Sequence, residues 1–217
     1  MKAIMISDHA QWCALMMNGD KTVEVRKGTA LYKATQKLID EYGYAEFYVY
    51  NTRDERYRLD KELNGKYFVW DTKSKDYPFD KTRNRHYFFG KVVFKFRCYK
   101  VEEIKLNKGA CGWFYETTTL CEKDLLKNSC LSLEDLRDYL DIIFGDYEVD
   151  SEKGCAIHIS DLEIFDKPKE LNEFYKVGHY EDLDDYFTDE KQINGKWCIP
   201  LKKAPQSMCY IEVKEEQ

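Results

Sequence analysis

The stretch that decides the fold is Ile4–Lys27, which reads IMISDHAQWCALMMNGDKTVEVRK. Its apolar start predicts a strand over Met1–Ser7, and the small and apolar residues that follow recur at the spacing of a mostly buried helix. Gly19 fits the left-handed position that ends such a helix. The polar run Lys21–Arg26 then opens a second strand, so this stretch builds core and places polar chemistry next to it.

The residues after Gly19 form the candidate site of the chain. Strict alternation along a strand places Thr22, Glu24 and Arg26 on one face and the two valines between them on the other, toward the core. Lys21 lies at the turn before them. A lysine, a carboxylate and a hydroxyl that meet in a cleft can support acid–base chemistry or hold the polar edge of a ring. The alternative is a surface strand on which Glu24 and Arg26 are neighbours of little consequence.

Length and composition favour a single folded domain with insertions. The chain has 217 residues and a mass of 25.9 kDa, and 43% of its residues are hydrophobic and 15% aromatic. Such a composition supports a real core and argues against disorder. No apolar run reaches the length of a membrane span, and the N-terminus lacks a secretory signal. We therefore expect a cytoplasmic protein without a membrane partner.

Eight cysteines are the other chemical feature of the composition. None of them forms a C-x-x-C pair, whereas zinc sites usually carry closely spaced ligand pairs. Most stand beside apolar or aromatic residues, as Cys13 does after Trp12 and Cys198 after Trp197. We expect reduced, buried, structural thiols rather than a metal cluster. The sequence predicts neither a metal site nor a cofactor.

The charge is unevenly distributed along the chain. Residues 73–100 carry nine basic and two acidic side chains, a net charge of +7, whereas the whole chain has a net charge of −6. The predicted strand His86–Tyr99 alternates, so that Lys91, Lys95 and Arg97 share the face opposite its apolar residues. This basic face, with Tyr99 and the Arg83–Arg85 loop, is the best candidate for a nucleic-acid track, because phosphate contacts need positive charge within reach and an aromatic ring offers a stacking surface. The alternative is a lysine-rich face that only keeps a strand soluble.

The rest of the chain alternates between short strands and helices. Aromatic and β-branched residues predict the strands, and apolar residues at helical spacing predict the helices. Short strands at varied spacing, with helices between some of them, favour an α+β fold built on a barrel or a curled sheet. The expected helical regions are Ala30–Tyr42 and Leu120–Phe144, and the expected strands are Glu46–Tyr50, Tyr67–Trp70, Cys155–Ser160, Trp197–Leu201 and Met208–Val213, with Lys167–Lys169 as a strand-breaking segment.

The order strand, buried helix, Gly-x-Lys-Thr-x-Glu-x-Arg and further strands resembles the ASCH domain, a branch of the PUA-like superfamily. The motif is carried by Gly19–Arg26, which reads GDKTVEVR. Later stretches resemble prophage-type bacterial members of the family, namely Ile157–Leu162 with Asp166–Pro168, and Ala204–Tyr210. The resemblance therefore touches both ends of the chain.

This resemblance implies a PUA-like β-barrel with flanking helices and a cleft beside the first helix. It implies one ASCH domain over residues 1–217, with Tyr42–Gly90 and Cys111–Glu152 as insertions. The family suggests RNA or nucleoside ligands, held by residues that line the cleft. These residues are Lys21, Glu24 and Arg26 of the motif, His9 in the first helical turn, and Ser207 and Tyr210 near the last strand. Alternatively, His9 is only a side chain at the helix start, Ser207 only a turn residue and Tyr210 only a core residue.

Some ASCH-like proteins are small amidohydrolases acting on acylated cytidine, and others are ribonucleases. In the amidohydrolases a Lys and a Thr of this motif work with a Glu from a later strand. Lys21 is present here, but Glu24 stands in the position of that Thr, and a carboxylate cannot replace a hydroxyl nucleophile. If the protein is an enzyme, Lys21 and Glu24 are the candidate catalytic residues, with Glu24 as general base.

Three functions are compatible with these observations. The first is binding of RNA or a nucleotide-like ligand in the cleft after the first helix, with the basic strand face extending the track. The second is a hydrolase of modified nucleosides or of RNA. The third is a prophage accessory module that binds another protein through the acidic segment Tyr180–Glu190. The sequence leaves the oligomeric state open.

Overall fold

The computed structural model shows an α+β protein in which the chain divides into two compact units. The first unit comprises Met1–Asn18, Glu46–Phe96 and Leu162–Gln217, and the second comprises Gly19–Ala45 and Arg97–Asp161. No helix in the described ranges has both the length and the apolar character needed to cross a membrane. The structure describes residues 1–54, 56–62, 64–75, 88–110, 112–140, 143–144, 149–150, 154–177 and 191–213, so the loop of residues 83–85 and the acidic segment of residues 180–190 lie outside it.

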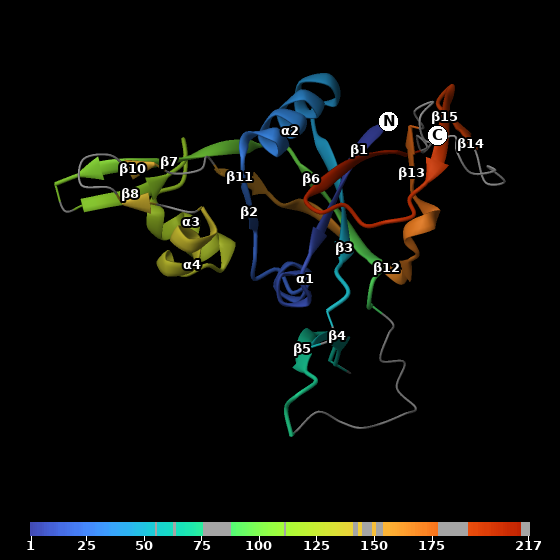
Figure 1. The fold of residues 1–217 in the computed structure, drawn as a ribbon, viewed down its shortest axis with the longest axis horizontal. Helices are drawn as coiled ribbons and strands as arrows, with labels where there is room; N and C mark the ends of the chain where they lie inside the picture. The colour runs from blue at the N-terminus through green and yellow to red at the C-terminus, as the bar shows by residue number, and fades with distance from the viewer. Residues whose placement is uncertain are drawn as a thin grey trace. The chain divides into compact units, whose positions relative to one another are not determined.

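A mixed eight-stranded sheet forms the first unit (Figure 1). Its strand β1 (Lys2–Asp8) lies parallel to β3 (Ala45–Asn51) and antiparallel to β16 (Met208–Glu212). The sheet is open, because β12 and β14 are its two edges, and no sheet of the described residues closes into a barrel. The remaining strands are β12 (Ser160–Lys169), β6 (Val92–Cys98), β13 (Tyr175–Val177), β15 (Lys196–Pro200) and β14 (Lys191–Ile193), in the order β12-β6-β3-β1-β16-β13-β15-β14.

Helix α1 (Ala10–Met17) packs in this unit against the hairpin of β4 (Tyr57–Lys61) and β5 (Tyr67–Asp71). The Asn18 side chain joins the helix end to the hairpin, since its Nδ2 donates to the Tyr67 carbonyl at 2.7 Å and its Oδ1 accepts from the Tyr67 N–H at 2.8 Å. The left-handed Gly19 then turns the chain away, as the sequence predicts.

An antiparallel four-stranded sheet forms the second unit, in the order β2-β11-β7-β8. Helices α3 and α4 lie beside the β7–β8 hairpin, and α2 packs against β7 and β11 (Figure 1). Ser132 begins α4 with a capping box, in which its hydroxyl and the Asp135 carboxylate each accept a backbone N–H. The bounds are β2 (Val23–Lys27), α2 (Thr29–Tyr42), β7 (Val101–Gly109), β8 (Gly112–Glu116), α3 (Glu122–Ser129), α4 (Leu133–Tyr139) and β11 (Gly154–His158), with the short β9 (Ile143–Phe144), β10 (Val149–Asp150) and, in the first unit, the 3-10 turn η1 (Leu171–Glu173).

Three expectations about elements need correction. The strand predicted over His86–Tyr99 is shorter, since β6 begins at Val92 and the described residues 88–91 before it form a turn. The helical region predicted over Leu120–Phe144 is two short helices, α3 and α4, and its last two residues form β9; Cys130, which follows α3, adopts a left-handed conformation. The segment Lys167–Lys169 does not interrupt a strand, because it forms the last three residues of β12. A proline lacks the N–H that a ladder needs, and β12 tolerates it because it is an edge strand.

Candidate functional site

The three motif residues of the sequence analysis meet in a buried charge network in the second unit. Lys21 and Glu24 are only 3% and 4% exposed. The Lys21 Nζ lies 3.2 Å from Glu24 Oε2 and donates to the Ser129 carbonyl at 2.8 Å. The Arg26 Nε lies 2.6 Å from Glu24 Oε1, an ion pair by distance whose angle falls outside hydrogen-bond geometry. We call Lys21, Glu24 and Arg26 the β2 network.

Strand pairing explains why these side chains converge. In the β2–β11 ladder Glu24 lies opposite Ile157 and Arg26 opposite Cys155, so that Glu24 and Arg26 share one face. The valines on the other face are buried in the core with α3 and α4, as predicted. Lys21 reaches the C-terminal end of α3, where helix carbonyls lack intrahelical partners and attract cations. The network is thus closed by its own partners and by a helix end.

The thiols near this network are not nucleophiles. Burial, with a smaller contribution from the Glu24 charge, raises the pKa of Cys155 to about 12, and burial raises the pKa of Cys98 to about 12 as well. Thiols with such pKa values stay protonated and inert. The cysteines of the described residues are free thiols, four of them buried, although Cys121 is exposed. Within the same residues, no group of three or more His, Cys, Asp or Glu side chains is arranged to hold a metal ion.

The other predicted ligand residues lie in the first unit. His9 precedes α1, and its Nδ1 lies 3.3 Å from the Thr52 hydroxyl. Ser207 is exposed in the turn before β16. Tyr210 lies on β16 with the Lys2 ammonium 4.3 Å from its ring centroid. Each therefore has a local environment of its own within the first unit.

The basic strand face is largely neutralised by carboxylates. The apolar side of β6 is fully buried, as the alternation predicts. Lys91, which precedes β6, has its Nζ 2.8 Å from Glu170, and on the other side of the strand Lys95 Nζ lies 3.3 Å from Glu163. Arg97 instead places its guanidinium over an aromatic ring, that of Tyr44. Of the predicted track, this arginine is thus the member whose guanidinium contacts an aromatic ring.

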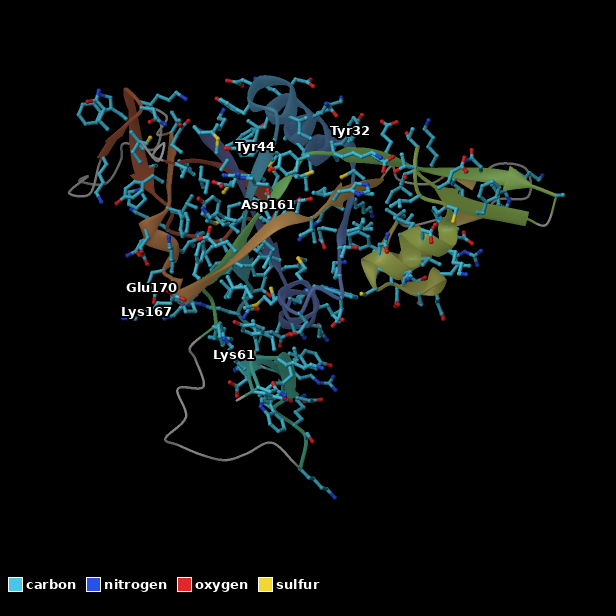
Figure 2. All side chains as sticks on the ribbon, turned by 180° about the vertical axis from the view of Figure 1, so that it is seen from behind. Tyr32, Tyr44, Lys61, Asp161, Lys167 and Glu170 are labelled. Carbon is cyan, nitrogen blue, oxygen red and sulfur yellow. The ribbon has the colours of Figure 1, made fainter. Side chains whose placement is uncertain are left out.

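Arg97 belongs to an exposed aromatic cluster that we call the tyrosine platform. Its guanidinium carbon lies 4.6 Å from the Tyr44 ring centroid, and the Tyr44 and Tyr99 rings are 6.0 Å apart. Tyr99 is 47% exposed, and its hydroxyl donates to Asp161 at 2.5 Å. This hydrogen bond raises the pKa of Tyr99 above its ordinary value. Figure 2 labels Tyr44 and Asp161 at this place.

The backbone holds the platform in position. Gly43 has a φ of 81° and ends α2, so that Tyr44 emerges directly after the helix. Asp161 has a φ of 46°, a left-handed conformation that Asp accepts more readily than most residues. Tyr44 and Asp161 come from distant segments of the chain, so local sequence patterns do not indicate that they meet. Gly43, which ends α2, is a local signal only for the position of Tyr44.

A second polar cluster, the Glu102 cluster, lies next to the platform along the chain. The Glu102 Oε2 accepts from the Thr119 hydroxyl at 2.8 Å and lies 2.7 Å from His158 Nε2. Lys100 Nζ donates to the Thr119 hydroxyl at 2.6 Å and lies 3.4 Å from Glu102. The other carboxylate oxygen of Glu102 is buried and has no hydrogen-bond partner in the described part of the chain.

The pKa of Glu102 predicts how this cluster responds to acid. Burial acts to raise that pKa, but the hydrogen bonds from His158 and Thr119 and the charge of Lys100 outweigh it, so the pKa lies below the ordinary value of 4.5. A carboxylate with a lowered folded-state pKa stabilises the fold fully above the ordinary value, and this stabilisation is lost as the pH falls through the folded pKa.

Glu102→Gln should therefore lower the free energy of unfolding by about 2 kcal/mol at neutral pH, because hydrogen bonds to a charged group are lost. The difference from the unaltered protein should shrink as the pH falls below the ordinary value of 4.5 and through the lowered pKa of the folded state. Urea unfolding at several pH values measures both effects. A difference that is constant with pH would contradict the stabilising role of the ionised carboxylate.

Comparison of the chain with protein-family models, with curated proteins and with solved structures finds no match.

Proposed function

We propose that this protein binds RNA or a nucleotide-like ligand, with the tyrosine platform as the surface on which a base stacks. The observation that carries the proposal is the exposed Tyr99 ring beside Tyr44, with the Arg97 guanidinium over the second ring. Aromatic side chains with a neighbouring cation are the usual means of holding single-stranded bases, because every base has a face that stacks. The Asp161 hydrogen bond limits the motion of the Tyr99 ring.

We also propose that the chain is related to the ASCH proteins. The order strand, buried helix and Gly-x-Lys-Thr-x-Glu-x-Arg motif supports this relationship, as does the meeting of Lys21, Glu24 and Arg26. The open sheets give no support to the closed PUA-like barrel that the family implies. In this proposal the β2 network stabilises the second unit, which carries the tyrosine platform, and does not bind the ligand itself. Its charged groups already pair with one another and with the end of α3.

Tyr99→Ala should weaken the binding of single-stranded RNA by about 5- to 150-fold, because stacking of one base on an aromatic ring contributes about 1–3 kcal/mol. Tyr99→Phe keeps the ring and should retain most of the affinity. Fluorescence anisotropy with a labelled RNA of about ten nucleotides at about 50 mM salt measures the change.

Tyr139→Ala is the matched control, since Tyr139 is also exposed, at 41%, and lies on α4 away from the platform along the chain. Equal losses in Tyr99→Ala and Tyr139→Ala, or no RNA binding by the unaltered protein, would overturn the proposal.

The hydrolase alternative draws on the Glu102 cluster, where a histidine, a carboxylate and a hydroxyl meet. RNA that is shortened by the unaltered protein but not by His158→Gln would favour that alternative.

A further inference from the structure

A groove in the first unit has the charge and size of a ligand site that neither the motif nor the platform involves. It has a volume of about 730 Å³, within the range of about 300–1,000 Å³ typical of small-molecule sites. Tyr50, Leu201 and other apolar residues form part of its lining. Its polar lining includes Arg53, Lys202 and Lys203.

The lining carries an excess of positive charge. Arg53, Lys202 and Lys203 are exposed, and none of them forms an ion pair with a described residue. Among the described residues of the lining, Glu170 is the one carboxylate; it is labelled in Figure 2 and lies 2.8 Å from Lys91 Nζ, so that its charge is already balanced. The groove therefore presents three cations to an incoming ligand.

Arg53 is held in place by the backbone around it. The Asn51 N–H donates to the Lys91 carbonyl at 2.8 Å, and the Asn51 side chain donates to the Phe88 carbonyl at 2.9 Å. The Arg53 side chain lies over Gly90 so closely that a Cβ there would be 2.6 Å from Nε and 2.8 Å from Cγ. A side chain at position 90 would force the Arg53 side chain to move, and the left-handed φ of 66° at this position also favours glycine.

The opposite wall is the segment between β15 and β16, and it is anchored at both ends. The Leu201 N–H donates to the Phe174 carbonyl at 2.8 Å. The Ser7 hydroxyl donates to the Pro205 carbonyl at 2.6 Å. Lys202 and Lys203 lie between these two anchors, so the sheet fixes the backbone that carries them.

We infer that this groove binds a compact polyanion of the diphosphate class, with its organic part against the apolar lining. The planar guanidinium of Arg53 suits two phosphate oxygens at once, and the two lysines add mobile positive charge. Three cations also match the charge of a diphosphate better than that of a single carboxylate. The inference is independent of the proposed RNA binding, because it uses other residues in the other unit.

Titration calorimetry with pyrophosphate, with adenosine 5′-diphosphate and with citrate tests this inference on the full chain. We expect the two phosphate compounds to bind and citrate to bind at least about tenfold more weakly. Binding of citrate as tight as that of pyrophosphate would overturn the phosphate assignment, and binding of none of the three would overturn the site.

Arg53→Ala and the double change Lys202→Gln with Lys203→Gln should each weaken pyrophosphate binding by about tenfold or more, because each removes charged donors. The matched control is Lys33→Gln with Lys37→Gln, which removes the same charge from the exposed side of α2 and should leave the affinity unchanged. If the control loses as much affinity, the effect comes from the net charge of the protein and not from the groove, and the proposed site is wrong.

Gly90→Ala tests the placement of Arg53. It should weaken pyrophosphate binding as Arg53→Ala does, and combining the two changes should add little, because both remove the same contact. Circular dichroism establishes that each variant is folded. Tyr99→Ala should bind pyrophosphate like the unaltered protein, so failure of the RNA proposal and failure of this one remain distinguishable.

Discussion

Phe47→Ala should lower the free energy of unfolding by about 4 kcal/mol, because a large buried ring is replaced by a cavity. Phe47 lies on β3 with no exposed surface. Its ring stacks on that of Phe96 with centroids 4.9 Å apart and planes at 4°. Such a pair adds about 0.5–1.5 kcal/mol to the burial of the rings alone. Urea unfolding followed by circular dichroism measures the loss.

Phe47→Leu is the conservative control and should lose less than half as much, since most of the volume and all of the apolar character are kept. Trp197→Ala removes a larger aromatic side chain from a site that is 64% exposed, and should change stability by no more than about 0.5 kcal/mol. If Phe47→Ala and Trp197→Ala lose similar amounts, β3 is not a central strand of this unit.

Local patterns were sufficient to predict the elements that this core rests on. The alternation along β6 correctly separates its buried apolar residues from Lys95, and the helix predicted over Ala30–Tyr42 does end at Tyr42. These signals depend on residues two to four apart, where side-chain direction follows directly from backbone geometry. The resulting α+β class is therefore readable from the sequence.

Pairing between distant segments was not readable in the same way. Glu24 reads as a polar residue on the face away from the valines, yet it is buried because β2 pairs with β11, which begins at Gly154. The position of Pro168 within β12 likewise depends on that strand being an edge of the sheet. Register and edge position are properties of the assembled sheet, and the local sequence does not contain them.

The groove shows the same limit for function. Arg53 precedes the β4–β5 hairpin, whereas Lys202 and Lys203 follow β15 almost 150 residues later in the chain. Nothing in the sequence links them, because their meeting depends on the order of strands in the eight-stranded sheet. The candidate site that the sequence could indicate was the one whose residues lie within a single short motif.

Glu24→Ala should destabilise the second unit by about 3–5 kcal/mol, because it leaves the buried Lys21 and the half-buried Arg26 without the carboxylate that they share. Lys21 Nζ and Arg26 Nε lie 3.2 Å and 2.6 Å from the Glu24 oxygens. The end of α3 offers Lys21 only the partial negative charge of the Ser129 carbonyl, which cannot replace a full charge. Thermal and urea unfolding measure the loss.

Lys21→Met should cost less than Glu24→Ala, since Glu24 then keeps its ion pair with Arg26. This ordering separates the two roles that the motif could have. If the network serves mainly the fold, Glu24→Ala loses more stability than Lys21→Met. The RNA affinity of each variant then falls only as far as its folded fraction falls. A network that serves mainly ligand binding gives Glu24→Ala and Lys21→Met proteins that are stable but bind RNA weakly, and that result would contradict the closed, buried arrangement of Lys21 and Glu24.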